Sequence, residues 1–138
     1  MTPASVDDCV FCGIASGRFP AHVIDEDELT LAFLDIAPST VGHALVIPKR
    51  HAQDIWEVGE EDFTAVAATA RRVALRVRER LEPAGLNLIN SCRVAAWQTV
   101  FHIHVHVIPR YEGDGLVQPF VPAPGDPEEL RALATRLR

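Results

Sequence analysis

The chain has 138 residues, of which 48% are apolar and 23% are charged, a composition typical of one globular domain. Its 13 basic and 19 acidic residues give a net charge of -6, which argues against wrapping a long nucleic acid, since that binding needs many phosphate contacts. No apolar run has membrane-spanning length and the N-terminus is not basic, so we expect neither a membrane span nor a signal peptide. Three cysteines, two of them spaced Cys9-x-x-Cys12, favour a reducing, cytoplasmic environment.

Short strands are expected in the first third of the chain. Alternating apolar residues place Leu31, Phe33 and Asp35 on one face of the second strand. An acidic turn precedes that strand, and Pro48 ends the third. The expected strands are residues 21–24, 30–35 and 43–47.

One long amphipathic helix is expected in the middle of the chain. Acidic residues lie in its first turn and arginines near its end, as the helix dipole favours, and Pro83 and Gly85 end it. Apolar residues at helical spacing predict its buried stripe: Phe63, Val66, Ala67, Ala70, Ala74, Val77 and Leu81.

The last third adds two strands and an extension. Residues 86–90 and 101–108 are expected to pair as antiparallel strands across a loop. Four prolines then mark an extended surface segment, and Asp126-Pro127 begins a short helix over residues 128–137. The expected fold class is α+β, with a mostly antiparallel sheet of about five strands, one long helix and a short C-terminal helix.

The most informative segment is Phe101-His102-Ile103-His104-Val105-His106-Val107-Ile108. On a strand, this alternation would place the three imidazoles on one face, successive ones about 7 Å apart, and turn the apolar residues toward the core. A row of imidazoles is costly to bury without partners, which favours a functional role. Two roles are open: ligands of a catalytic metal, or a nucleophile or general base whose neighbours bind phosphate.

The cysteine pair bears on that choice. A catalytic metal would need a carboxylate or a further histidine to complete an open site, and the sequence offers two thiols instead. Two thiolates with two imidazoles would make a closed, structural zinc site. Such a site would leave the remaining histidines free for chemistry.

Together these residues resemble the signature of the histidine triad (HIT) family of nucleotide hydrolases and transferases, in its two-cysteine, zinc-binding bacterial branch. The resemblance covers about residues 7–115, and it implies a HIT-like fold in a single domain over residues 1–138. Residues 116–138 are then a proline-rich extension that ends in a short helix. Besides the triad, the matching motifs are Cys9-Val10-Phe11-Cys12, Leu31-Ala32-Phe33-Leu34-Asp35-Ile36, Gly42-His43-Ala44-Leu45-Val46-Ile47-Pro48-Lys49-Arg50-His51 and Gln98-Thr99-Val100-Phe101.

The resemblance implies a covalent, two-step mechanism. His104 matches the nucleophile that attacks the α-phosphorus of a nucleotide, and the carbonyl of His102 matches the acceptor that holds its other ring nitrogen. Imidazole suits this role because its ordinary pKa, about 6.5, leaves it largely neutral at pH 7. His106 and His43 match residues that donate to phosphate oxygens. The implied contacts to the phosphate and leaving group are Gln98 and Thr99.

A nucleotide pocket and a metal site are also implied. Asp35 matches the acid that binds the ribose hydroxyls, and Asn90 and Ser91 lie at the position of a further ribose or phosphate contact. The matching walls around the base are Phe11, Ile14, Phe19, Phe33 and Ile36. Two-cysteine members bind structural zinc through residues that match Cys9, Cys12, His51 and His102. No organic cofactor is implied, and because family members usually form two-fold dimers, a homodimer is expected.

Two positions depart from the family's pattern. Trp97 stands where many members have glycine, whose missing Cβ would let the backbone approach a phosphate. Ser91 stands where many members have asparagine, and its single hydroxyl reaches less far. We hypothesise that Trp97 tunes the leaving-group side of the site.

The expected function is hydrolysis of purine nucleotides that carry a labile substituent on the α-phosphate, such as nucleoside phosphoramidates. A dinucleoside polyphosphate hydrolase shares the covalent intermediate and is the alternative. Two other classes stay open: a nucleotide-binding module with little catalysis, and a metallohydrolase whose zinc is bound by the triad itself. Neither a membrane nor a nucleic acid polymer is expected as a partner.

Overall fold

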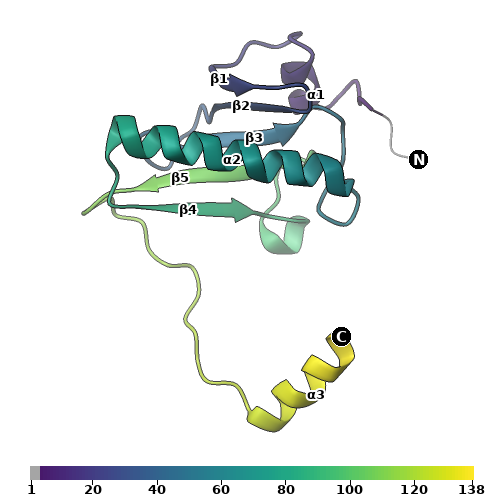
Figure 1. The fold of residues 1–138 in the computed structure, drawn as a ribbon, viewed down its shortest axis with the longest axis vertical. Coiled ribbons are helices and arrows are strands. Elements are labelled where there is room, and N and C mark those ends of the chain that lie inside the picture. The colour runs from purple at the N-terminus through teal and green to yellow at the C-terminus, as the bar shows by residue number, and fades with distance from the viewer. Residues whose placement is uncertain (1–3) are drawn as a thin grey trace.

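The computed structural model describes residues 4–138. Five antiparallel strands form one sheet in the order β1-β2-β3-β5-β4, and the long helix α2 crosses one of its faces (Figure 1). The predicted α+β architecture is therefore confirmed. In chain order the elements are α1 (Val10–Ala15), β1 (Val23–Glu26), β2 (Thr30–Leu34), β3 (Ala44–Pro48), α2 (Glu60–Leu81), β4 (Gly85–Asn90), the 3-10 turn η1 (Val94–Ala96), β5 (Val105–Arg110) and α3 (Pro127–Leu137).

Strand alternation divides the core between the two faces of the sheet. On one face, Ala32 lies opposite Val46, and both pack in a cluster with the apolar side of α2. On the other face, Phe33 lies opposite Leu45, and both pack against Phe11 of α1. Both faces of the central strands are thus covered, so apart from Thr30 these strands are continuously apolar. The face that carries α1 is the one that builds the site.

The buried stripe of α2 differs from the predicted one. Ala67 and Leu81 are exposed, while Thr69 and Val73 are buried. Thr69 is tolerated in the core because its hydroxyl lies 2.6 Å from that of Thr30. Because Thr69 is polar, a prediction based on the spacing of apolar residues did not include it. The predicted stripe is confirmed at Val66, Ala70 and Val77.

The strand predicted over residues 101–108 is wrong in its first half. Strand β5 begins at Val105, so of the three triad histidines only His106 lies on a strand. The segment before it follows the loop after β3 instead, since the Ile103 amide donates to the Ala52 carbonyl at 2.7 Å. Three consecutive side chains of this segment are buried, which a half-buried strand does not allow, and Phe101 is 43% exposed rather than in the core.

Other boundaries differ from prediction by one or two residues, and α1 was not predicted. Cys9 caps α1, because its Sγ accepts the backbone N–H of Cys12 at 3.3 Å. The sequence suggested only metal or redox chemistry for Cys9 and Cys12. The structure shows that these two residues also form the N-terminal cap of α1. At the other end, Asp126 caps α3 and Pro127 is its first residue, as predicted. Between residues 4 and 138, no helix combines the length and apolarity that crossing a membrane requires.

Candidate functional site

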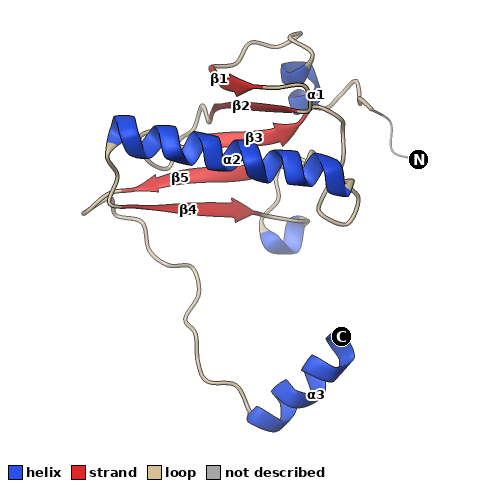
Figure 2. Ribbon diagram, in the orientation of Figure 1, coloured by secondary structure: helices blue, strands red, loops and turns tan. Residues whose placement is uncertain are grey.

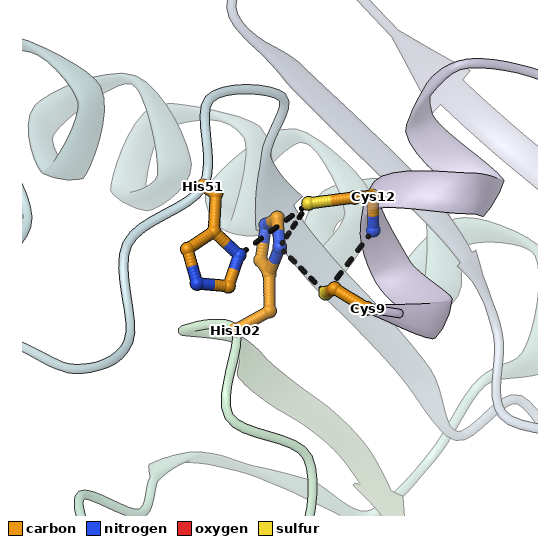
Figure 3. Close-up of side chains that lie close together, drawn as sticks. All are labelled: Cys9, Cys12, His51 and His102. Carbon is orange, nitrogen blue, oxygen red and sulfur yellow. Dashed lines mark hydrogen bonds between the residues drawn. The ribbon is translucent and has the colours of Figure 1, made fainter. Parts of the chain in front are cut away.

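Four predicted metal ligands from separate segments meet at one point (Figure 3). Cys9 and Cys12 come from the start of α1, His51 from the loop after β3, and His102 from the segment before β5. His102 Nδ1 lies 3.5 Å from each Sγ, and His51 Nδ1 lies 3.4 Å from that of Cys12. Tetrahedral zinc, with Zn–S near 2.3 Å and Zn–N near 2.0 Å, places sulfur and nitrogen about 3.5 Å apart. The four side chains therefore fit a zinc ion.

The orientation of His102 is set by the backbone. Its Nε2 lies 2.8 Å from the Pro48 carbonyl oxygen, which can only accept, so Nε2 carries the proton. Its Nδ1 then presents a lone pair to the two thiols. Burial, with smaller contributions from His51 and His104, lowers the pKa of His102 to about 4. A neutral imidazole whose second nitrogen is held by a carbonyl is the form that ligates metals.

His104 is held in the tautomer that a nucleophile requires. Its Nδ1 lies 2.8 Å from the carbonyl oxygen of His102, so Nδ1–H donates and Nε2 is left with its lone pair. Burial lowers the pKa of His104, partly offset by the hydrogen bond to His102 and by Asp35. The Asn90 side chain in turn donates to the His104 carbonyl at 2.9 Å and so fixes the backbone that carries the imidazole.

Beside His104, the imidazoles of His43 and His106 form a hydrogen-bonded pair whose tautomers are also fixed by the backbone. The Ser39 amide donates to His43 Nδ1 at 3.0 Å, which puts the proton of His43 on Nε2. That proton is donated to His106 Nδ1 at 2.9 Å, so His106 keeps its own proton on Nε2. The oxygen and nitrogen atoms of Asp35, His43 and His106 are close enough to surround a cation. Because His43 Nε2 carries a proton in this arrangement, it has no lone pair for a metal.

A cavity of about 480 Å³ opens beside His104 and His106. Its volume is within the range of small-molecule sites, and its walls are largely apolar. It brings together most of the predicted nucleotide-site residues, namely Phe11, Ile14, Phe19, Phe33, Asp35, Ile36, Thr99, His104 and His106. The sequence analysis assigned no role in the site to the other wall residues, which are Val10, Pro20, Ala21, Leu34, Ala37, Leu45 and Val100.

Four residues predicted for the nucleotide site lie outside the cavity wall. His43 is not part of the cavity wall and donates a hydrogen bond to His106. The Asn90 side chain donates a hydrogen bond to the His104 carbonyl. Gln98 is buried, with its side chain bonded to the backbone of residues 53, 93 and 100. In this arrangement Gln98 stiffens the loop before the triad. Ser91 is half-buried, and its predicted ligand contact stays a prediction.

Trp97 adopts a backbone conformation that favours glycine. Its φ of 75° lies in the left-handed region, which costs a non-glycine residue free energy. The indole stacks on Phe120 of the C-terminal segment, with ring centroids 5.6 Å apart and planes 17° from parallel. The tryptophan that stands here in place of the family's glycine is thus accommodated by its stack on Phe120, which lies outside the loop.

The neutral imidazoles make stability depend on pH. Burial lowers the pKa of His106 to about 4 and that of His43 below 6.5, with Asp35 opposing both shifts. The unfolded chain regains the ordinary value and takes up protons that the folded state excludes. Stability is therefore complete above about pH 6.5 and falls as the pH drops toward 4. Urea unfolding from about pH 7.5 to 5 should show this loss above the range where carboxylates titrate. A smaller slope is expected for His106→Asn, and a flat wild-type profile would contradict the prediction.

The antiparallel sheet, the crossing helix and the carbonyl-anchored histidines together define a histidine triad domain. The family model described as "HIT domain" matches residues 16–113, and the chain belongs to the HIT family. The crystal structure of SMU.412c from Streptococcus mutans is 39% identical and has a TM-score of 0.92, covering 97% of this chain and 85% of that one.

Two further solved structures bear on metal and ligand. A Zn-bound histidine triad family protein from Mycobacterium smegmatis is 47% identical, with a TM-score of 0.76, covering 94% of this chain and 95% of that one. A histidine triad nucleotide-binding protein from Candida albicans is 28% identical, with a TM-score of 0.84, and 94% of each chain is covered. The family expected from the motifs is confirmed, and a relative within it is bound to zinc.

Proposed function

We propose that the chain hydrolyses purine nucleotides that carry a labile substituent on the α-phosphate, with nucleoside phosphoramidates as the substrate class. The observation that carries this proposal is the anchored tautomer of His104, whose Nε2 lone pair belongs to a residue of the cavity wall. The Candida albicans relative, named as nucleotide-binding, supports a nucleotide as the ligand.

In the first step, His104 Nε2 attacks the α-phosphorus. A phosphorus–nitrogen bond forms to the imidazole, and the bond to the leaving group breaks with its electron pair going to the departing amine, which takes up a proton from solvent. The imidazole becomes cationic, and its Nδ1–H bond to the His102 carbonyl stabilises that charge. His106 Nε2–H, held by His43, donates to a phosphate oxygen as negative charge develops there.

In the second step, water attacks the same phosphorus. The phosphorus–nitrogen bond to His104 breaks, the imidazole returns to its neutral form, and the proton from water passes to solvent. The net reaction consumes one water and yields a nucleoside monophosphate and the free amine. Thr99, at the cavity wall, offers its hydroxyl to the phosphate or to the leaving group.

The nucleoside would occupy the apolar part of the cavity. Phe11 and Phe33 meet edge to face, 5.5 Å apart, and form a rigid wall for a planar base. Asp35 is half-buried at the same cavity, and its carboxylate can accept hydrogen bonds from ribose hydroxyls. In the free protein one of its oxygens is bonded to the Ala37 amide, which holds the carboxylate in place.

Cys9, Cys12, His51 and His102 would hold a structural zinc ion. Bound there, zinc supplies no chemistry to the reaction and ties α1 and the loop after β3 to the segment that carries the nucleophile. The zinc-bound relative supports this assignment. The three cysteines are free, and free thiols are consistent with a cytoplasmic location. A homodimer, as in other members of the family, completes the proposal.

The test is intact-protein mass spectrometry after brief incubation with adenosine 5′-phosphoramidate, with AMP release followed in parallel. AMP release and a transient adduct of one adenylyl group are expected. Bound nucleotide without release would favour the binding-module alternative. Release with diadenosine polyphosphates alone would favour the dinucleoside polyphosphate alternative.

Trp97→Gly is expected to change leaving-group preference with little change in stability. Glycine removes the left-handed strain but loses the Phe120 stack, and each effect is worth about 1 kcal/mol. Since Trp97 lies two residues before Thr99, its removal should favour bulky aromatic amines over ammonia as leaving groups. Relative rates on two phosphoramidates measure this, with Trp56→Ala, an exposed indole away from the cavity, as control. Unchanged relative rates would end the hypothesis.

A further inference from the structure

A second cavity, of about 590 Å³, lies on the face of the sheet that α2 crosses, between the last turns of that helix and strands β1 and β2 (Figures 1 and 2). Its volume is within the range of small-molecule sites. Its apolar lining consists of Ile24, Leu34, Val73, Val77 and Leu81. Among residues 4–138, none of those proposed for catalysis, nucleotide binding or zinc lines this cavity, so a ligand bound here goes beyond the proposed function.

The hydrophobic core is incompletely covered at this cavity. Ile24 of β1 and Leu34 of β2 pack against the buried cluster under α2, but both are only partly buried. Leu81 is 41% exposed, and because α2 ends at this residue, no further turn of α2 covers its neighbours. The cavity therefore presents apolar surface to the body of a small ligand, and burial of such surface favours binding.

A β-bulge in β1 holds Arg76 at the cavity. The pairing of β1 with β2 shifts register between Val23 and Asp25, which makes Ile24 the extra residue of the bulge. The Ile24 carbonyl accepts a hydrogen bond from Arg76 Nη1 at 2.7 Å, and the Asp25 carboxylate accepts one from Arg76 Nη2 at 3.2 Å. Arg76 is therefore fixed in place, and its charge is compensated by Asp25.

Arg80 lines the same cavity one helical turn after Arg76. This residue is exposed, and its guanidinium has no hydrogen-bond or ion-pair partner within residues 4–138. The positions three and four residues away in the chain hold Arg76, Val77, Pro83 and Ala84, so no carboxylate faces Arg80 from its own helix. An uncompensated guanidinium beside apolar walls selects a ligand that has a negative charge and an apolar body.

We propose that this cavity binds a small amphipathic carboxylate, whose alkyl chain lies on the apolar walls and whose carboxylate is bound by Arg80. A guanidinium donates two parallel N–H bonds to a carboxylate, which gives the contact a fixed direction. One uncompensated guanidinium matches one negative charge, so a singly charged carboxylate binds better than an alcohol of the same chain length. The two arginines at the cavity repel the corresponding alkylammonium ion.

The test is a calorimetric titration of the full chain with octanoate, for the wild type and two variants of α2. Arg80→Gln removes the proposed partner of the carboxylate and keeps a polar side chain. Arg78→Gln is the matched control, because Arg78 is also exposed and, two residues away on a helix, lies on the other side. Octanoate affinity should fall about fivefold or more in Arg80→Gln and stay at the wild-type value in Arg78→Gln. Octan-1-ol and octylammonium should bind the wild type at least about fivefold more weakly than octanoate.

NMR of the backbone amide signals locates the bound octanoate. Signals of Ile24 and Val77 should shift, while those of Phe11 and Thr99, at the cavity beside His104, should stay in place. Shifts at Phe11 and Thr99 instead would put octanoate in that other cavity and overturn the proposal. It is also overturned by an absence of saturable binding, by equal affinities in the two variants, or by octan-1-ol binding as tightly as octanoate. AMP release by the wild type tests the proposed function separately, since its catalytic residues do not line the octanoate cavity.

Discussion

His104→Ala is expected to abolish AMP release from adenosine 5′-phosphoramidate, by about 10⁴-fold or more, and to remove the adenylyl adduct. The loss is large because, among residues 4–138, no other side chain of the cavity wall presents an imidazole lone pair: His106 keeps its proton on Nε2. Nucleotide binding should persist, since the apolar walls and Asp35 are untouched. Turnover, adduct mass and nucleotide affinity are measured on the same preparation.

His22→Ala is the matched control, because this histidine is exposed and lies outside the cavity wall. It should release AMP at the wild-type rate. Equal release by wild type and His104→Ala would remove His104 from the nucleophile's role and restore the metal-centred alternative. A thermal unfolding midpoint within a few degrees of wild type would show that the loss is chemical rather than structural.

Cys12→Ser is expected to lose the metal and a large part of the stability. Zinc content should fall from about one ion per chain toward zero, because serine replaces a soft thiolate with a weak ligand. Metal binding contributes directly to folding free energy, so the unfolding midpoint should fall by at least about 10 °C. Elemental analysis and thermal unfolding check the two effects.

Cys92→Ser is the control for that variant. Its thiol is half-buried and donates to the Asn90 side chain at 3.0 Å, a bond that serine can also make, and it lies outside the metal cluster. Metal content and stability should stay near wild type. The wild type treated with a chelator separates the two metal models: activity should decline together with folded protein if the zinc is structural. Immediate loss of activity in fully folded protein would instead favour a metal at the triad.

The sequence alone was enough for the family, and it named most of the residues that line the cavity and all four that form the metal cluster. Alternating histidines after Gln98-Thr99, with the cysteine pair far upstream, indicated the HIT motifs, and residues such as Phe33 and Asp35 follow from strand alternation. Side-chain type and spacing are local properties, so a pattern records them directly. The order of the elements and the antiparallel sheet could be predicted for the same reason.

Only the tertiary structure decided where the histidines lie and which of their ring nitrogens carries the proton. The sequence placed all three on one face of a strand, but His102 and His104 precede β5, where Ile103 binds the loop after β3 instead of a neighbouring strand. That pairing joins residues 51 positions apart, and nothing in the local pattern reports it. The tautomers likewise depend on the carbonyls of Pro48 and His102 and on the amide of Ser39. Backbone groups are the same at every residue, so only the fold selects which of them meets an imidazole.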